Sequence, residues 1–237
     1  MKVALILSGQ FREAKYCYKG IKENILDIYN PDVFISTWTN SSNITPSGWF
    51  GNYQNDDCTI SDIIEMYKPK SIELDTFDDE EYQPFKKMAD KLDSKINYKT
   101  KSTNVNAMWY KRHRANLLRK QFEDLNNFKY DVVISSRFDL EILEPLSFEL
   151  KENHLLIPIG FDWCEGLSDL FALGNSDTMN DYFDLYNLME YYRLEKNVSA
   201  APELIMKYHV SHKNLEVIRF LLKCKLRGSN VWECALT

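Results

Sequence analysis

Short apolar runs alternate with longer segments in which apolar positions recur every three to five residues. The short runs are typical of strands buried on both faces, and the periodic segments favour amphipathic helices. The predicted strands cover residues 3–7, 32–38, 71–74, 131–136, 154–159, 169–174 and 215–220. The predicted helices cover residues 11–29, 61–67, 104–126, 176–192 and 202–212. This alternation predicts an α/β fold, Rossmann-like, with a central, mostly parallel sheet flanked by helices.

Some boundaries have recognisable signals. Pro31 ends the first helix, so residues 3–38 form a βαβ unit with parallel strands. We expect Ser61 or Asp62 to cap the second helix, and Ser176 or Asp177 the fourth. Residues 3–7 and 131–136 are apolar enough to be neighbouring central strands. Residues 39–59 form a long polar loop, and residues 75–103 are mostly charged and predict no clear element.

Composition narrows the class of protein. A chain of 237 residues with 44% hydrophobic and 14% aromatic residues is globular, and its length fits one domain. A net charge of −6 argues against a dedicated nucleic-acid binder. The five cysteines are scattered without a CxxC pair, which favours a reducing compartment over a disulfide framework or a zinc site. The first apolar run is too short for a signal peptide, and no run is long enough to span a membrane. We therefore expect a soluble, cytoplasmic protein.

The loop after the first strand offers groups that suit an anion. Ser8 and Gly9 end the strand, and Arg12 follows at the start of the helix. A glycine lets the backbone approach a ligand, and a guanidinium can bind phosphate. A tight turn with a surface arginine explains the same residues equally well. The dinucleotide and Walker fingerprints are absent.

Arg137 and Asp139 follow the strand at residues 131–136. In an open α/β sheet, ligands bind at the carboxyl ends of the strands. Asp139 could bind Mn²⁺ or Mg²⁺ bridging a diphosphate, and Arg137 could neutralise the same diphosphate. The alternative is an ion pair that solvates the end of a strand.

Two further segments carry candidate chemistry. Residues 162–169 hold several carboxylates between two predicted strands, and Glu165 or Asp169 could be a general base or a ligand for hydroxyl groups. Turn and cap chemistry is the rival explanation for each. The helix at residues 104–126 is strongly basic, and for most of its cations we expect a solvated face.

Together these segments resemble the GT-A class of nucleotide-sugar glycosyltransferases, and more closely small bacterial and viral enzymes of surface-polysaccharide synthesis. The resemblance rests on blocks spread over most of the chain in the expected order. The blocks are residues 8–12, 32–38, 106–111, 130–139, 169–174 and 202–203. Where GT-A enzymes have a DxD motif that binds metal and diphosphate, this chain has Arg137 in place of the first aspartate, and Asp139 matches the second.

The resemblance implies a transferase that moves a sugar from a nucleoside diphosphate, such as UDP, to a hydroxyl acceptor in glycan or polysaccharide synthesis. Residues 1–140 would bind the nucleotide, through Ser8, Gly9, Arg12, Arg137 and Asp139, and residues 141–237 would bind the acceptor. Asp169 and Glu165 would be the catalytic carboxylates, and Asp139 would bind any metal ion. Two alternatives are a nucleotidyltransferase and a catalytically weak module that binds a nucleotide sugar or a glycan. The donor sugar, its base, the acceptor and the stereochemical course are not determined.

Overall fold

The computed structural model describes residues 1–39, 57–76, 87, 91 and 102–227. Most of the predicted polar loop at residues 39–59 and of the charged segment at residues 75–103 therefore lies outside the described residues.

The described residues form a seven-stranded sheet. Its order is β3 (Ser71–Asp75), β2 (Asp32–Trp38), β1 (Val3–Gly9), β4 (Val132–Arg137), β7 (Ala172–Gly174), β6 (His154–Pro158) and β8 (Glu216–Phe220). Strand β7 is antiparallel to both of its neighbours, and every other pairing is parallel. The predicted mostly parallel α/β sheet is confirmed. So is the prediction that β1 and β4 are adjacent, because they pair in parallel at the centre of the sheet.

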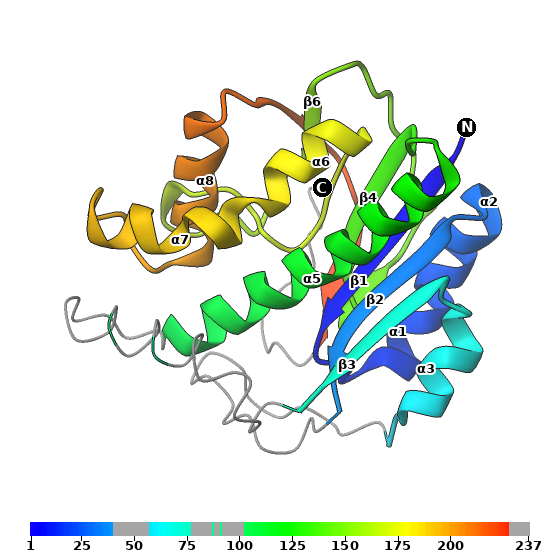
Figure 1. Cartoon of the computed structure of the whole chain (residues 1–237). Helices are drawn as coiled ribbons and strands as arrows, with labels where there is room; N and C mark the ends of the chain where they lie inside the picture. The colour runs from blue at the N-terminus through cyan, green and yellow to red at the C-terminus, as the bar shows by residue number, and fades with distance from the viewer. Residues whose placement is uncertain (40–56, 77–86, 88–90, 92–101, 228–237) are drawn as a thin grey trace.

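Helices cover both faces of this sheet (Figure 1). One face carries α1 (Ala14–Ile21), a π-helical turn (η1, Lys22–Leu26), α2 (Asp27–Tyr29) and α3 (Ile60–Tyr67). The other carries α5 (Ser102–Asn126), α6 (Ser176–Phe183), α7 (Leu185–Leu194) and α8 (Pro202–His212). Strand β1 shows why two layers are needed. Its Leu5 and Leu7 pack in the hydrophobic core beneath α1 and α3, whereas Ala4 and Ile6 pack in the core beneath α5, α6, α7 and α8. Both faces of the strand are buried, and its sequence is therefore apolar without interruption.

Several predicted boundaries are wrong. Strand β7 begins only at Ala172, because its pairing with β4 starts there, so Asp169 lies in the preceding loop. The helix predicted for residues 176–192 is two helices that meet at Asp184. The caps also lie earlier in the chain than predicted. Asn175 caps α6, and Thr59 forms a reciprocal capping box with Asp62 at the start of α3.

The basic stretch of α5 is not the solvated face that we predicted. Packing of the sheet on one side and of α6 and α7 on the other leaves much of this helix without access to solvent. Three of its cations are buried and each has an acidic partner. The pairs are Lys111–Asp75, Arg112–Asp169 and Arg119–Glu123. The pattern of charges along the helix does not reveal that each buried cation has a carboxylate partner elsewhere in the fold or on the same helix.

The sequence also gave no signal for a small second sheet, which pairs β5 (Leu140–Ile142) with β9 (Cys224–Leu226) in antiparallel orientation. Both strands have only three residues, too few for a periodic pattern. The backbone N–H of Arg227, directly after β9, donates to the carbonyl of Asp139 at 2.9 Å. The small sheet thereby fixes the segment that follows β4. None of the helices in the described part of the chain is both long and apolar enough to cross a membrane.

Candidate functional site

The carboxyl ends of β1 and β4 lie side by side, and this brings the two predicted phosphate-binding segments together. Ser8 of β1 is the register partner of Arg137 of β4. The next residue of β1, Gly9, has a φ of 94°, a conformation that favours glycine. No described atom lies within 4 Å of the place where its Cβ would stand. A ligand can therefore approach the backbone at Gly9 closely.

Arg12 and Arg137 both bind the buried carboxylate of Asp139. Arg137 donates from Nε to Oδ1 and from Nη2 to Oδ2, each at 2.7 Å. Arg12 donates from Nε to Oδ2 at 3.3 Å, from the turn that follows β1. The Asp139 side chain is only 3% exposed, and the two guanidiniums are partly exposed. Two cations against one carboxylate leave this cluster with a net positive charge, which suits an anionic ligand.

The electrostatics of Asp139 follow from these contacts. Burial by itself would raise the pKa of Asp139, but Arg137 and Arg12 outweigh it and hold that pKa below the ordinary value of 3.8. Asp139 is thus a permanent anion that positions two arginines, rather than a residue that titrates in the neutral range.

A divalent metal ion does not fit Asp139 in this arrangement. Both of its oxygens already accept hydrogen bonds from guanidinium groups, and a cation would meet two positive charges at the same carboxylate. No group of three metal-ligating side chains occurs among the described residues. The predicted metal ligand role of Asp139 therefore finds no support in the chemistry of its neighbours.

Asp169 lies in the loop before β7 and is 5% exposed. Its Oδ2 accepts a hydrogen bond of 3.3 Å from Nη1 of Arg112, which is also buried. The Arg112 guanidinium in turn stacks on Trp109, 4.5 Å from the ring centre. Asp169 is therefore the counter-ion of a buried arginine, and this is a strong structural reason for an aspartate at this position.

Glu165, the second predicted carboxylate, ends a short 3-10 turn, η3 (Trp163–Glu165), and its side chain is exposed. Its carbonyl accepts a hydrogen bond of 2.6 Å from Lys207 of α8. Nearby, Asp162 accepts from Arg219 of β8 at 2.7 Å and from the backbone of Ser168 at 2.8 Å. The turn is thus tied to both α8 and β8, while the Glu165 carboxylate itself lies at the surface.

Glu203, on the first turn of α8, is a carboxyl group to which the sequence assigned no role. The backbone N–H of Leu167 donates to its carbonyl at 3.0 Å. Burial and then the charges of Asp169 and Asp162 raise the pKa of Glu203 to about 8, although Arg137 acts in the opposite sense. The charged groups that shift the pKa of Glu203 thus include Arg137 at the end of β4, and Asp162 and Asp169 in the segment before β7. In the sequence, Pro202 marks the helix start and residues 202–203 are one of the blocks of the family resemblance, but no role followed for Glu203.

Buried polar atoms without a hydrogen-bond partner in the described structure occur beside these groups. They are Nε2 of Gln10, both polar side-chain atoms of Asn106, and Nε1 of Trp109. Gln10 lies between Gly9 and Arg12, and Trp109 lies against Arg112. Leaving such atoms unpaired costs about 1 to 3 kcal/mol each.

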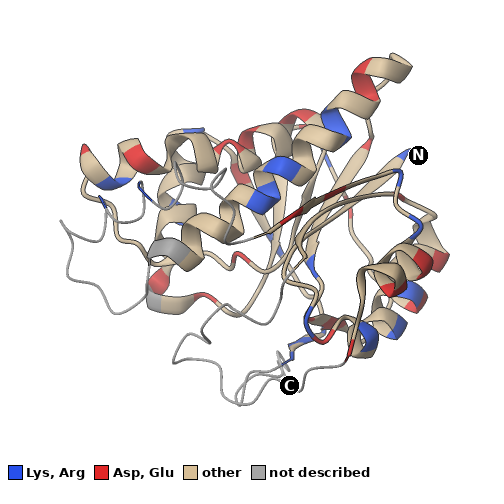
Figure 2. Cartoon of the chain, turned by 60° about the horizontal axis from the view of Figure 1, so that its bottom comes forward, with Lys and Arg blue, Asp and Glu red and all other residues tan. Residues whose placement is uncertain are grey.

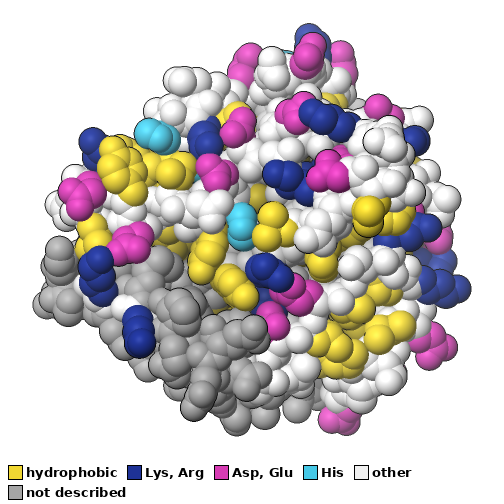
Figure 3. All heavy atoms as spheres, in the orientation of Figure 1, with side chains coloured by type: hydrophobic (Ala, Val, Ile, Leu, Met, Phe, Trp, Pro, Cys, Tyr) yellow, Lys and Arg dark blue, Asp and Glu magenta, His cyan; other side chains and the backbone are white. Residues whose placement is uncertain are grey.

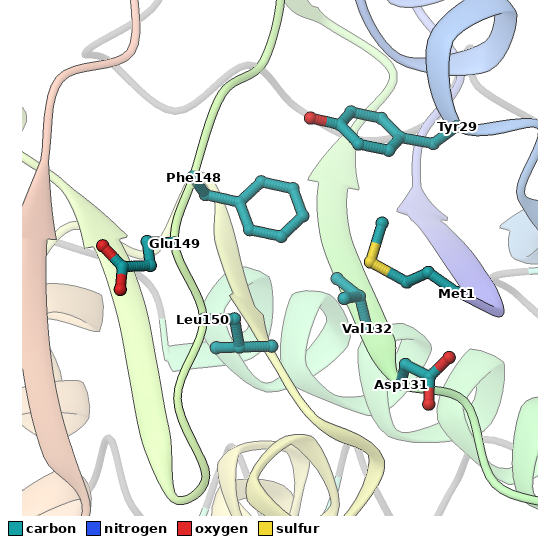
Figure 4. Close-up of a pocket in the computed structure, with 7 residues that line it drawn as sticks. All are labelled: Met1, Tyr29, Asp131, Val132, Phe148, Glu149 and Leu150. Atoms are coloured by element: carbon teal, nitrogen blue, oxygen red, sulfur yellow. The ribbon is translucent and has the colours of Figure 1, made fainter.

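A surface depression lies at the other end of the strands, away from Arg12 and Arg137 (Figure 4). It lies at the amino end of β4, and its lining is mostly apolar. The lining residues are Met1, Tyr29, Asp131, Val132, Phe148, Glu149 and Leu150. The hydroxyl of Tyr29 is already bound to the carbonyl of Leu146, and Asp131 to the backbone of Lys2. This depression therefore presents no convergent set of uncommitted polar groups.

Charged side chains elsewhere are mixed in sign. Figure 2 shows Lys and Arg interspersed with Asp and Glu along the elements, and Figure 3 shows the same mixture on the face that carries α5. On the described elements in these views, no broad basic field of the kind that binds nucleic acid is seen.

The chain was compared with known families, curated proteins and solved structures. No family model matches the sequence, and no curated protein is similar to it. Among solved structures, the chain is similar to the apo-form glycosyltransferase GlyE of Streptococcus pneumoniae TIGR4, with 12% identity and a TM-score of 0.46. The similarity covers 92% of this chain and 45% of that one, so this chain spans less than half of its length. The roles of individual residues have to come from the site itself.

Proposed function

We propose that the protein is a glycosyltransferase that moves a sugar from a nucleoside diphosphate sugar to a hydroxyl acceptor. The observation that carries the proposal is the convergence of Arg12 and Arg137 on Asp139 at the carboxyl ends of β1 and β4. Ligands of open α/β sheets bind at this edge. Two arginines held by a buried carboxylate are pre-organised to bind a diphosphate bidentately.

The chemistry requires that the diphosphate leaves with the electron pair of its bond to the anomeric carbon. Arg12 and Arg137 would stabilise the negative charge that develops on it, and Ser8 and Gly9 would contact the nucleotide through the backbone. A metal ion would supply the same stabilisation if it were bound, but the neighbours of Asp139 do not favour one. The proposal therefore assigns charge stabilisation to the two arginines.

The acceptor would lie on the side of the loop before β7. Asp169, positioned by Arg112, would be a ligand for an acceptor hydroxyl, and Glu165 would lie at the solvent-exposed rim. The division of the chain into a nucleotide half and an acceptor half at about residue 140 stays a prediction.

The test is a thermal-shift screen over nucleoside diphosphates, nucleoside triphosphates and nucleotide sugars, followed by assays of sugar transfer and hydrolysis. A ligand that binds only the native state raises the melting temperature. We expect stabilisation by at least one nucleoside diphosphate and by the matching nucleotide sugar, with transfer in both Mn²⁺ and EDTA. Binding without transfer to any hydroxyl acceptor or water would instead indicate a binding module. Release of pyrophosphate from a nucleoside triphosphate would indicate a nucleotidyltransferase.

A further inference from the structure

The carboxyl groups around the candidate site differ in whether a cation compensates them. Asp139 has Arg12 and Arg137, Asp162 has Arg219, and Asp169 has Arg112. Each of these carboxylates is therefore committed to a structural ion pair. Glu203 differs, because within the described structure no ion pair and no hydrogen bond from another residue involves its carboxyl group. Its one hydrogen bond comes from its own backbone N–H.

The backbone of Glu203 is held firmly although its carboxyl group is uncommitted. Pro202 begins α8, and the carbonyl of Glu203 accepts from the N–H of Leu167 at 3.0 Å. The loop approaches so closely that a Cβ on Gly166 would lie 2.5 Å from both the carbonyl carbon and the Cβ of Glu203. Glycine is needed here for this close approach, since its φ of −79° is open to any residue. The start of α8 and the loop before β7 are thus in direct contact at Glu203, in the loop that also carries Asp169.

We propose that Glu203 is the general base that accepts the proton of the acceptor hydroxyl. This inference rests on the proposed glycosyl transfer. As the acceptor oxygen forms its bond to the anomeric carbon, its proton passes to a carboxylate oxygen of Glu203. The bond between the anomeric carbon and the diphosphate breaks, and the electron pair leaves with the diphosphate beside Arg12 and Arg137. Asp169 keeps its place as counter-ion of Arg112 and as ligand of the acceptor hydroxyl.

The charges that face Glu203 support this assignment. Asp169 and Asp162 make ionisation of Glu203 harder and Arg137 makes it easier, and burial is the largest influence. The pKa of about 8 lies close to neutral pH, where a general base is most effective. Turnover should therefore rise with pH between about 7 and 9, as Glu203 loses its proton.

The same pKa can be tested without any activity. Since the folded pKa of about 8 lies above the ordinary value of 4.5, the stabilising contribution of bound protons is complete below pH 4.5 and is lost as the pH rises through 8. Glu203→Gln removes this dependence. The melting temperature of the variant relative to the wild type should therefore rise between pH 5 and pH 9.

The decisive experiment compares Glu203→Gln, Glu203→Asp and the control Glu152→Gln, which changes an exposed glutamate in the turn before β6. With the nucleotide sugar found in the screen, we expect Glu203→Gln to lower turnover by about 10² to 10⁴-fold and to abolish the rise with pH. Donor affinity should stay within about twofold of the wild type. Glu203→Asp should retain part of the turnover.

Three results would count against the inference. Turnover of Glu203→Gln within a few-fold of the wild type, or an unchanged pH profile, overturns the role of Glu203 and leaves glycosyl transfer intact. Equal loss of donor binding and turnover places Glu203 on the donor side instead. A wild-type protein that binds no nucleotide sugar and transfers no sugar overturns the proposed function and the inference together. If Glu203→Gln does not fold, Glu203→Asp and its pH profile decide.

Discussion

Arg137 and Asp139, two residues apart at the end of β4, are joined by two hydrogen bonds of 2.7 Å in the bidentate geometry of a guanidinium and a carboxylate. The pair is not a solvated end of a strand, because Asp139 is almost fully buried and is shared with Arg12. One buried anion thus fixes two cations from neighbouring strands.

Replacing Asp139 by Asn should destabilise the protein, because two arginines lose their buried counter-ion. Breaking a buried ion pair from one side costs about 3 to 5 kcal/mol. Urea unfolding at pH 7 measures the loss. Asp177→Asn, which removes an exposed carboxylate paired with Lys129, is the matched control and should change stability by less than about 1 kcal/mol.

The cost of Asp139→Asn should depend on pH. The depressed pKa of Asp139 means that its contribution is present above the ordinary value of 3.8 and is lost as the pH falls through the lower folded value. The difference between variant and wild type should therefore shrink below about pH 4. A difference that stays constant down to pH 2 would contradict the ion-pair account.

Arg12→Ala should weaken the binding of nucleoside diphosphate by about 1 to 3 kcal/mol, which is the scale of a hydrogen bond to a charged group. Calorimetry measures the affinity. Arg12→Lys should recover only part of it, since an ammonium lacks the planar fork of a guanidinium. Lys19→Ala removes an exposed charge from α1, the helix that follows Arg12, and should leave affinity unchanged. Equal affinity in Arg12→Ala for every nucleotide would remove this loop from the site.

Asp169→Asn should lower the free energy of unfolding by about 3 to 5 kcal/mol, because Arg112 stays buried without its counter-ion. The double variant Arg112→Met, Asp169→Leu should recover most of this stability, since an apolar pair avoids the uncompensated charge. Thermal and urea unfolding of the wild type, Arg112→Met, Asp169→Leu and the double variant give the coupling energy. A double variant as unstable as the sum of the single variants would show that the two residues act independently.

Gly166→Ala should displace Glu203, because the added methyl group would lie 2.5 Å from its backbone. Overpacking of this kind costs about 1 to 3 kcal/mol. If Glu203 is the base, turnover should fall more than donor affinity does. Gly20→Ala introduces a comparable clash, but against Ile142 of β5, and controls for loss of stability alone. Equal turnover losses in both variants, at equal loss of stability, would mean that the position of Glu203 is not the cause.

The sequence by itself determined the architecture. The apolar runs at residues 3–7 and 131–136 predicted strands buried on both faces, and the helical segments between strands predicted parallel crossovers. It also singled out Arg12, Arg137 and Asp139 as candidates, because charges shortly after buried strands stand out against their neighbours. These signals come from short stretches of neighbouring residues and from the spacing of the hydrophobic positions.

Only the tertiary structure decided which charges compensate one another. Arg112 and Asp169 lie 57 positions apart in the sequence. Gly166 in the loop before β7 contacts Glu203 of α8, although β7, α6 and α7 separate them along the chain. No periodic pattern encodes such distant pairings, because burial and partner choice depend on how helices and loops pack. The same limit explains why the cations of α5 were expected in solvent, and why the environment of the Glu203 carboxyl group became apparent only in the folded chain.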